Sequence, residues 1–353
     1  MSWQPLWLAV LLATCVSPLA AKTYYVGTCH AGSFATISAA VGSPDVEPGS
    51  IVKVCPGAYY EQVIISKPLT LEGMVSQNGS QAQINGNSPM QLATSAVFGV
   101  SFYPLVWITA GPVKIQNLST DDEDYLGEAN PPEYVGFYFA SGGYGSLTHV
   151  ASHGVNVGSS VWMENANTPA TSVMVRDSFL DNGIVAIANP SQSPLLTVDI
   201  SNNQDSVNWG TSTGSFGVYL SDVGGTVTGN SIWGRKYSFN FYEPAMLFKQ
   251  ETFGVYDNAP GVIVSGNNIM FPDYGFLLPM NTYGVVILAD QVIVKSNKIG
   301  GTRAGIDMEC HHATVSGNTI NLSVNGLVRV PSGFTGVNTF YNTGTDSTQN
   351  ACP

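Results

Sequence analysis

The chain has 353 residues and a formal net charge of −12; 10% of its residues are charged and 44% are hydrophobic. This acidity argues against a nucleic-acid partner and favours a neutral or lightly charged glycan over a polyuronate, which would need local basic groups or Ca²⁺. With 38 glycines and almost no stretch that reads as a long amphipathic helix, the composition predicts an all-β protein with many turns.

Residues 1–21 have the pattern of an export signal. An apolar run from Trp3 to Val16 is followed by small residues up to Ala21, which suits cleavage before Lys22, although no Lys or Arg precedes the run. The run is too short for a bilayer span, and no later segment reaches about 18 apolar residues. We therefore expect a secreted or periplasmic protein without a membrane span, with residues 22–353 forming one domain.

A short helix is expected near residues 33–42. Ser33 is suited to be its N-cap, and Phe34, Ile37, Ala40 and Val41 recur on one helical face. A helix with one apolar face can cover the open end of a stack of strands.

This helix opens a segment, residues 33–73, that resembles the start of the pectin-lyase-like superfamily, particularly pectin methylesterases and related secreted β-helix proteins. Besides the helix, the matching residues are Pro48-Gly49, Ile51-Val52, Pro56-Gly57, Tyr59 or Tyr60, Glu61, Val63, Lys67-Pro68-Leu69 and Gly73. The resemblance implies a single right-handed parallel β-helix with an N-terminal capping helix, and action on extracellular polysaccharides. The catalytic motifs of methylesterases, polygalacturonases and pectate lyases are absent, so the resemblance implies no particular reaction.

Acidic residues cluster in the middle of the chain. They are Asp121, Asp122, Glu123, Asp124, Glu128 and Glu133. Carboxylates can hold Ca²⁺ in an exported protein, but neither EF-hand spacing nor a glycine-rich nonapeptide repeat is present. A solvated loop is the alternative, and no cofactor or metal is assigned.

The C-terminal half repeats itself. Four times a glycine stands 13 residues before an asparagine, with short strand-like runs between them: Gly217 and Asn230, Gly254 and Asn267, Gly284 and Asn297, Gly305 and Asn318. The internal spacing is constant while the distance between copies varies, which is typical of a solenoid with loops inserted between rigid turns.

Apolar and polar residues alternate within each copy, as expected for short parallel strands with one buried face. Asparagine tolerates the left-handed backbone region, and its amide can bond to groups above and below. We expect Asn230, Asn267, Asn297 and Asn318 to stack as an internal ladder on successive turns.

An insertion at residues 233–253 lengthens one turn and gathers aromatic and basic residues. Trp233, Arg235, Lys236 and Lys249 are its candidate substrate-binding residues, because aromatic and basic side chains suit sugar rings and carboxylate groups. The alternative is a hydrophobic flap folded back on the rod.

Asp307, Glu309 and His311 are the candidate catalytic residues. If Ile306 and Met308 point inward, the two carboxylates lie outward on one strand, about 6.5 to 7 Å apart at Cα. Such a pair is within reach of glycosidase geometry. Tyr219 and Tyr256 fill the slot of Asp307 on earlier turns and are expected to help bind a sugar chain. A solvated polar strand is the alternative.

Cys29, Cys55, Cys310 and Cys352 remain after removal of the signal. Three pairings are possible, but in a rod only pairing within each end keeps the Cα atoms about 4.4 to 6.8 Å apart. We expect disulfides between Cys29 and Cys55 and between Cys310 and Cys352.

Two functions fit these features. One is an exported enzyme, a hydrolase or lyase, that binds or processes an extracellular polysaccharide on the outer surface of the solenoid. The other is a non-catalytic β-helix that binds a surface or matrix. In both cases we expect a monomer.

Overall fold

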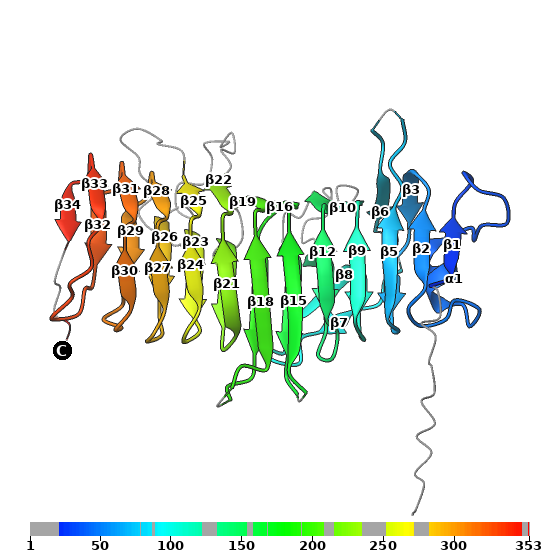
Figure 1. Ribbon diagram of the computed structural model, residues 1–353, viewed down its shortest axis with the longest axis horizontal. Coiled ribbons are helices and arrows are strands. Elements are labelled where there is room, and N and C mark those ends of the chain that lie inside the picture. Colours follow the sequence, from blue (N-terminus) through cyan, green and yellow to red (C-terminus); the bar gives the residue numbers. More distant parts are fainter. Residues whose placement is uncertain are drawn as a thin grey trace, which may run out of the picture.

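The computed structural model describes residues 21–77, 79–86, 89–121, 133–153, 158–167, 169–191, 193–207, 215–234, 252–271, 282–347 and 352. Over these residues the chain winds into a rod whose sides are three sheets of parallel strands (Figure 1). The protein is a right-handed parallel β-helix, which confirms the expected fold class. The export signal expected at residues 1–21 lies outside the described residues except for Ala21.

Each turn of the rod contributes strands to the sheets A, B and C in order. In the described residues, sheet A contains β1 (Thr23–Val26), β2 (Ile51–Val54), β5 (Leu69–Gly73), β9 (Val113–Gln116), β12 (Gly145–Thr148), β15 (Thr171–Arg176), β18 (Leu196–Ser201), β21 (Gly224–Thr228), β24 (Ile263–Ser265), β27 (Ile293–Lys295) and β30 (Thr314–Ser316).

Sheet B contains β3 (Gly57–Tyr60), β6 (Ala82–Asn85), β10 (Leu118–Asp121), β13 (Ala151–His153), β16 (Phe179–Asp181), β19 (Gln204–Val207), β22 (Ser231–Gly234), β25 (Asn268–Met270), β28 (Lys298–Gly300), β31 (Thr319–Asn321) and β33 (Thr339–Tyr341).

Sheet C contains β4 (Val63–Ile65), β8 (Ser101–Ile108), β11 (Tyr134–Phe139), β14 (Gly158–Asn165), β17 (Ile184–Ala188), β20 (Ser215–Ser221), β23 (Thr252–Asn258), β26 (Thr282–Ile287), β29 (Ala304–Asp307), β32 (Asn325–Val328) and β34 (Thr345–Ser347). The short strand β7 (Ala93–Thr94) pairs antiparallel with β8.

The core is a set of apolar rows that run along the inside of the rod. Because every strand pairs in register with its neighbours, one inward residue lies directly above the next, as Val227, Val264, Val294 and Val315 do in sheet A. These four side chains are at most 1% exposed. The predicted alternation of buried and exposed residues is therefore confirmed in the four copies.

The corner between sheets A and B carries the expected asparagine ladder. The side-chain amide and backbone N–H of Asn230 both donate to Oδ1 of Asn267 at 2.9 Å. The same two bonds join Asn267 to Asn297 and Asn297 to Asn318, again at 2.9 Å. The predicted stacking of these four residues is confirmed.

The ladder is longer than the spacing rule predicted. Asn203 donates to Asn230 at 3.0 Å, and Asn318 donates to Asn338 at 2.9 Å, so one member is added at each end. The rule missed both because no glycine stands at the required position before them. From Asn203 to Asn318 the residue before each ladder asparagine is left-handed, for example Gly229 with φ 67°.

The only helix among the described residues is α1 (Ile37–Gly42), which packs against β1, β2 and β4 at the N-terminal end of the rod. The expected N-cap was wrong: Thr36 caps the helix and accepts from Ala39 N at 3.1 Å. Ser33 instead donates to the carbonyl of His30 at 2.9 Å. No helix in the described part of the chain is long and apolar enough to cross a membrane.

Both predicted disulfides are confirmed. Cys29 bonds to Cys55 with a Cα separation of 5.7 Å, and Cys310 bonds to Cys352 with a separation of 5.4 Å. Each bridge therefore closes a loop near one end of the rod, where a turn has a neighbour on one side only.

Candidate functional site

Most of the longest connections of the chain join sheet B to sheet C. Segments 86–100, 122–133, 208–214, 235–251 and 271–281 each join a strand of sheet B to the next strand of sheet C. Connections from sheet A to sheet B are mostly short, as at 177–178 and 202–203. Insertions on one side of a solenoid usually flank its binding face, which directs attention to sheet B.

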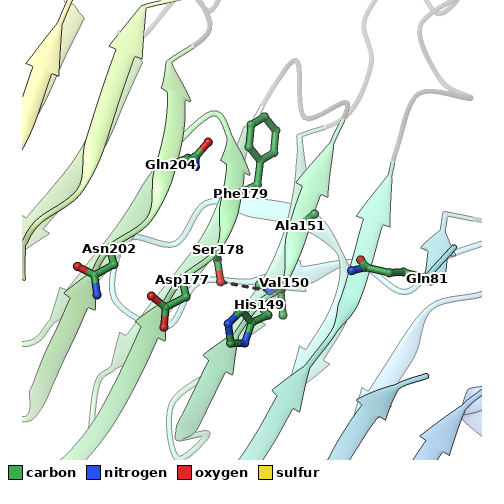
Figure 2. A pocket seen from close by; sticks show the side chains of 9 residues that line it. All are labelled: Gln81, His149, Val150, Ala151, Asp177, Ser178, Phe179, Asn202 and Gln204. Carbon is green, nitrogen blue, oxygen red and sulfur yellow. Dashed lines mark hydrogen bonds between the residues drawn. The ribbon is translucent and has the colours of Figure 1, made fainter. Parts of the chain in front are cut away.

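An open groove with a volume of about 460 Å³ lies where sheet A turns into sheet B (Figure 2). Its lining residues come from the corners and from the outer face of sheet B. They are Gln81, His149, Val150, Ala151, Asp177, Ser178, Phe179, Asn202 and Gln204.

Three polar side chains of the groove stand at equivalent corners on successive turns. His149, Asp177 and Asn202 have φ values of 53°, 52° and 57°, so each adopts the left-handed conformation that lets the chain turn sharply. Neighbouring strands lie about 4.8 Å apart, and the groove therefore presents one polar side chain per turn at this spacing.

Phe179 and Gln204 extend the groove onto sheet B. They are the first residues of β16 and β19 and pair in register. The residues that follow them, Leu180 and Asp205, are buried in the interior, so the two side chains face outward. Behind them Ser178 accepts a hydrogen bond from Val150 N at 3.2 Å, which ties the adjacent corners together (Figure 2).

The chemistry of this groove suits uncharged hydroxyl groups. Its side chains offer amides, an imidazole and a carboxylate as hydrogen-bond donors and acceptors, with the ring of Phe179 as an apolar surface. No Lys or Arg is among the described residues that line the groove. These residues therefore offer an anionic chain no compensating charge.

Sequence reasoning missed this groove. The signal was the pair of residues at each corner, His149-Val150, Asp177-Ser178 and Asn202-Asn203, which are equivalent to Gly229-Asn230 further along the rod. Of the three pairs in the groove, only Asn202-Asn203 contains a ladder asparagine. The two earlier corners have Val150 and Ser178 at that position, so they do not match the repeat by sequence.

Asp307 lies in the predicted slot but is not exposed. The register aligns Tyr219, Tyr256, Val286 and Asp307 on successive turns of sheet C. The Asp307 side chain is 0% exposed, and both of its oxygens contact Arg329, with Nε donating to Oδ1 at 2.8 Å. Ile306 and Met308 point inward and Asp307 outward, as expected, but Arg329 covers the carboxylate, so it is not open to solvent.

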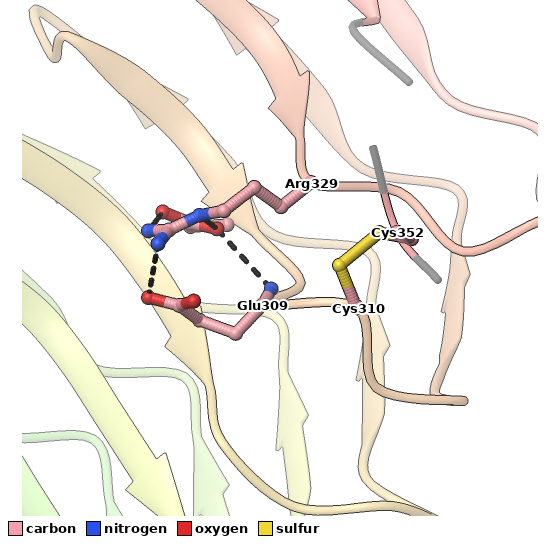
Figure 3. Close-up of polar contacts among 5 residues, drawn as sticks. Glu309, Cys310, Arg329 and Cys352 are labelled. Carbon is pink, nitrogen blue, oxygen red and sulfur yellow. Dashed lines mark hydrogen bonds and ion pairs between the residues drawn. A yellow bond between two sulfur atoms is a disulfide. The ribbon is translucent and has the colours of Figure 1, made fainter. Parts of the chain in front are cut away.

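Glu309 shares the same arginine. Its Oε1 lies 2.6 Å from Nη1 of Arg329, so one guanidinium joins the two predicted carboxylates (Figure 3). Strand β29 ends at Asp307, and Glu309 has φ 44°, so the expected extended spacing of the two carboxylates is wrong. The turn that carries Cys310 bends the chain away before the strand reaches Glu309.

His311 lies on the next part of this turn. Its Nδ1 is 3.3 Å from Oδ1 of Asp290, and both side chains are substantially exposed. A backbone hydrogen bond from His312 lowers the pKa of Asp290, with smaller contributions from the His311 ring. The structure thus brings Asp307 and Glu309 together and pairs His311 with a different carboxylate.

The predicted binding residues lie on two different sheets. Tyr219 is half-buried on sheet C, with ring centroids 6.1 Å from Phe98 and 5.0 Å from Phe216. Trp233 lies on sheet B, 6.3 Å from the ring of Phe179. The side chains of Tyr256, Arg235, Lys236 and Lys249 lie outside the described residues.

The acidic cluster is described only at its edges. Asp121 accepts a hydrogen bond from Nε2 of Gln83 at 2.9 Å, and Glu133 precedes β11. Asp122, Glu123, Asp124 and Glu128 lie outside the described residues. Within the described ranges no group of three His, Cys, Asp or Glu side chains is arranged to hold a metal ion.

No family model matches the chain, and no curated protein matches it significantly. Three solved structures resemble it at low identity. The Escherichia coli protein YbhC has a TM-score of 0.46 and 11% identity over 80% of this chain and 78% of that chain. The A-module of the mannuronan C-5 epimerase of Azotobacter vinelandii has a TM-score of 0.41 and 12% identity over 88% and 92%.

The third is PfbA, a surface adhesin of Streptococcus pneumoniae, with a TM-score of 0.36 and 12% identity over 84% of this chain and 85% of that chain. The β-helix described above rests on the pairing of the strands themselves. It is the fold that the resemblance to the pectin-lyase-like superfamily implied.

Proposed function

We propose that the protein is an exported β-helix that binds a neutral extracellular polysaccharide in the groove between sheets A and B. The observation that carries this proposal is the composition of the groove. Amide, imidazole and carboxylate groups recur beside the half-buried ring of Phe179, and no cation is among the described lining residues. Hydrogen bonds to hydroxyl groups and stacking of a sugar ring on an aromatic face use these groups.

The charge of the chain supports a neutral ligand. At a formal net charge of −12, the protein repels polyanions over distances of about a Debye length. The Asp177 carboxylate adds a negative charge inside the groove itself. A glycan rich in uronic acids would meet this repulsion without a matching basic side chain.

The disulfides support export. Both bridges lie in the mature segment, and such bonds persist in oxidising compartments. Together with the signal-like residues 1–21, they support a function outside the cytoplasm. A non-catalytic protein that binds a surface or matrix would use the same groove. Turnover of the bound glycan distinguishes an enzyme from such a binding protein.

The test is binding of soluble neutral glycans by affinity electrophoresis and calorimetry, after a glycan-array screen to choose them. Phe179→Ala is expected to weaken binding by roughly 1 to 3 kcal/mol because it removes the apolar face of the groove. Asn202→Ala removes one polar group and is expected to cost about 1 kcal/mol.

Asn268→Ala is the matched control, because Asn268 is exposed on sheet B but lies outside the groove. Equal binding by the wild type and both groove variants would place the ligand elsewhere on the rod. Binding of polyuronates in preference to neutral glycans would contradict the proposed ligand class.

A second candidate surface runs from sheet C onto the turn after β29, with Tyr219 on the sheet and Glu309 and His311 on the turn; Tyr256 is the register partner of Tyr219. The observation that favours it is the pair formed by His311 with Asp290, both of which are accessible. Tyr219→Ala and Tyr256→Ala are expected to weaken glycan retention if this surface binds, and Glu309→Gln is expected to abolish turnover if it catalyses. Unchanged binding and turnover in all three variants would exclude it.

A further inference from the structure

Next to the groove, the outer face of sheet B carries a row of four polar side chains on consecutive strands. Asp121 of β10 pairs in register with His153 of β13, and Asp181 of β16 pairs with Ser206 of β19. The register of β13 with β16 places His153 beside Asp181. An imidazole therefore lies between two carboxylates, one strand from each.

Asp181 is held in a fixed orientation beneath the histidine. Its side chain is 4% exposed, and its Oδ1 accepts a hydrogen bond from the Ser206 hydroxyl at 2.6 Å. The other oxygen, Oδ2, lies 3.8 Å from Nδ1 of His153, whose side chain is 42% exposed. A small rotation of the imidazole completes a hydrogen bond, and catalytic bonds of this type are often long without a ligand.

Phe179 connects this row to the groove. Its ring lines the groove, and its centroid lies 5.4 Å from that of His153. A glycan that stacks on Phe179 consequently has its substituents within reach of the exposed imidazole. Gln204, the register partner of Phe179, is exposed and also lines the groove.

We propose that His153 is a catalytic base, positioned by Asp181, that hydrolyses acyl esters on a neutral glycan held in the groove. This inference rests on the proposed function, because the groove supplies the substrate. A partly exposed imidazole held by a buried carboxylate is an arrangement that transfers protons at neutral pH.

The same geometry is less suited to two other reactions on polysaccharides. Cleavage of a glycosidic bond uses two carboxyl groups about 5 to 9.5 Å apart with the sugar between them. Here the imidazole of His153 occupies the strand between Asp121 and Asp181. Elimination from a uronate needs cations that hold the sugar carboxylate, and the adjoining groove is lined by no Lys or Arg.

The proposed step balances without a cofactor. Nε2 of His153 takes a proton from water while the water oxygen bonds to the acyl carbon, and the Gln204 amide donates to the developing oxyanion. The bond from this carbon to the sugar oxygen then breaks, and the imidazolium returns its proton to the sugar oxygen. The products are a carboxylic acid and a free sugar hydroxyl.

The test is the release of acetate from acetylated glucomannan and from acetylated xylo-oligosaccharides by the full mature chain. His153→Ala is expected to lower the rate by about 100-fold or more, as for loss of a general base, while binding of the deacetylated glycan is kept. Added imidazole is expected to restore part of the rate. His30→Ala, at an exposed histidine near the N-terminal end, is the matched control.

Asp181→Asn tests the positioning role. It is expected to lower kcat with KM unchanged and to move the acidic limb of the pH–rate profile, because Asp181 and Asp121 are the carboxylates beside His153 among the described residues. Asp181→Glu is expected to recover part of kcat. A wild type that binds deacetylated glycan but releases no acetate overturns the inference and leaves the proposed function intact. Absence of both binding and release overturns both, and full activity of His153→Ala overturns the role of this residue.

Discussion

A Cβ atom on Gly284 would lie 2.3 Å from Cγ2 of Ile299. The same relation recurs one turn later, where a Cβ on Gly305 would lie 2.5 Å from Cγ2 of Ile320. The glycine that opens each of these copies therefore makes room for the isoleucine that follows the ladder asparagine of the same copy. This contact between sheet C and sheet B explains why the first glycine of a copy and the isoleucine near its end occur together at a fixed spacing.

Gly305→Ala is accordingly expected to destabilise the protein by about 1 to 3 kcal/mol, as for other overpacked cores. Gly42→Ala is the control, because a Cβ at Gly42 meets no atom within 4 Å. Chemical denaturation measures both. In a double-mutant cycle, Ile320→Ala should cost less in the Gly305→Ala background than alone, and additive costs would disprove the steric coupling.

Asn267→Ala is expected to cost about 2 to 4 kcal/mol. Asn267 is 1% exposed, and its removal leaves the backbone N–H of Asn230 and the carbonyl of Val227 without their hydrogen bonds. Asn338→Ala, at the exposed end of the ladder, should cost clearly less. Equal losses in the two variants would show that the ladder does not act through buried polar groups.

The protein is expected to lose stability as the pH rises from about 4 to 7. Burial raises the pKa of Asp257 to about 7, against about 3.9 in an unfolded chain. The folded state thus holds a proton that the unfolded state releases, so this stabilisation is complete below about pH 4 and is lost as the pH passes 7. Burial raises the pKa of Asp205 in the same direction.

Asp257→Asn isolates this effect, since an amide oxygen can still accept the hydrogen bond from Ala259 N. The variant should match the wild type at pH 4 and unfold at a higher urea concentration at pH 8. A wild type and a variant with the same pH dependence would show that Asp257 is not the group responsible.

Asp307→Ala is expected to destabilise the protein by about 1 to 3 kcal/mol, because it removes the buried partner of Arg329 and leaves only the ion pair with Glu309. The Arg329 side chain is 39% exposed, which keeps the loss below that of a fully buried pair. Thermal unfolding of this variant and of Asp307→Ala/Arg329→Met measures the coupling. A stable Asp307→Asn variant that binds an identified glycan but no longer turns it over would instead support the catalytic role predicted from the sequence.

The solenoid was predictable because the same stabilising contacts recur on each turn. Ladder asparagines such as Asn230 and Asn267 make the same hydrogen bonds on each turn, so their spacing recurs in the sequence. The disulfides followed from the rod, because a rod separates Cys29 from Cys352. In contrast, the helix start moved from Ser33 to Thr36, since both residues can cap and only the tertiary contacts decide between them.

The candidate site was not predictable in the same way. Asp307 occupies the expected slot, but the partner that buries it, Arg329, lies on the following turn, and nothing in the local pattern links the two. His153 and Asp181 are separated by a full turn as well, in a part of the chain without recognisable copies. Which residues meet between turns depends on the length of each loop. Loop length varies from copy to copy, so the repeat does not predict these contacts.

The asparagine ladder also gives the rod an electrical direction. From Asn203 to Asn318 each side-chain amide donates one N–H to Oδ1 of the next ladder asparagine and the other to a backbone carbonyl of the preceding turn. The bonds between ladder amides therefore all run in one direction along the rod, and each bond polarises the next. The peptide dipoles of a sheet contribute little along this axis because they alternate in direction, so the ladder makes the two ends of the rod electrostatically unlike.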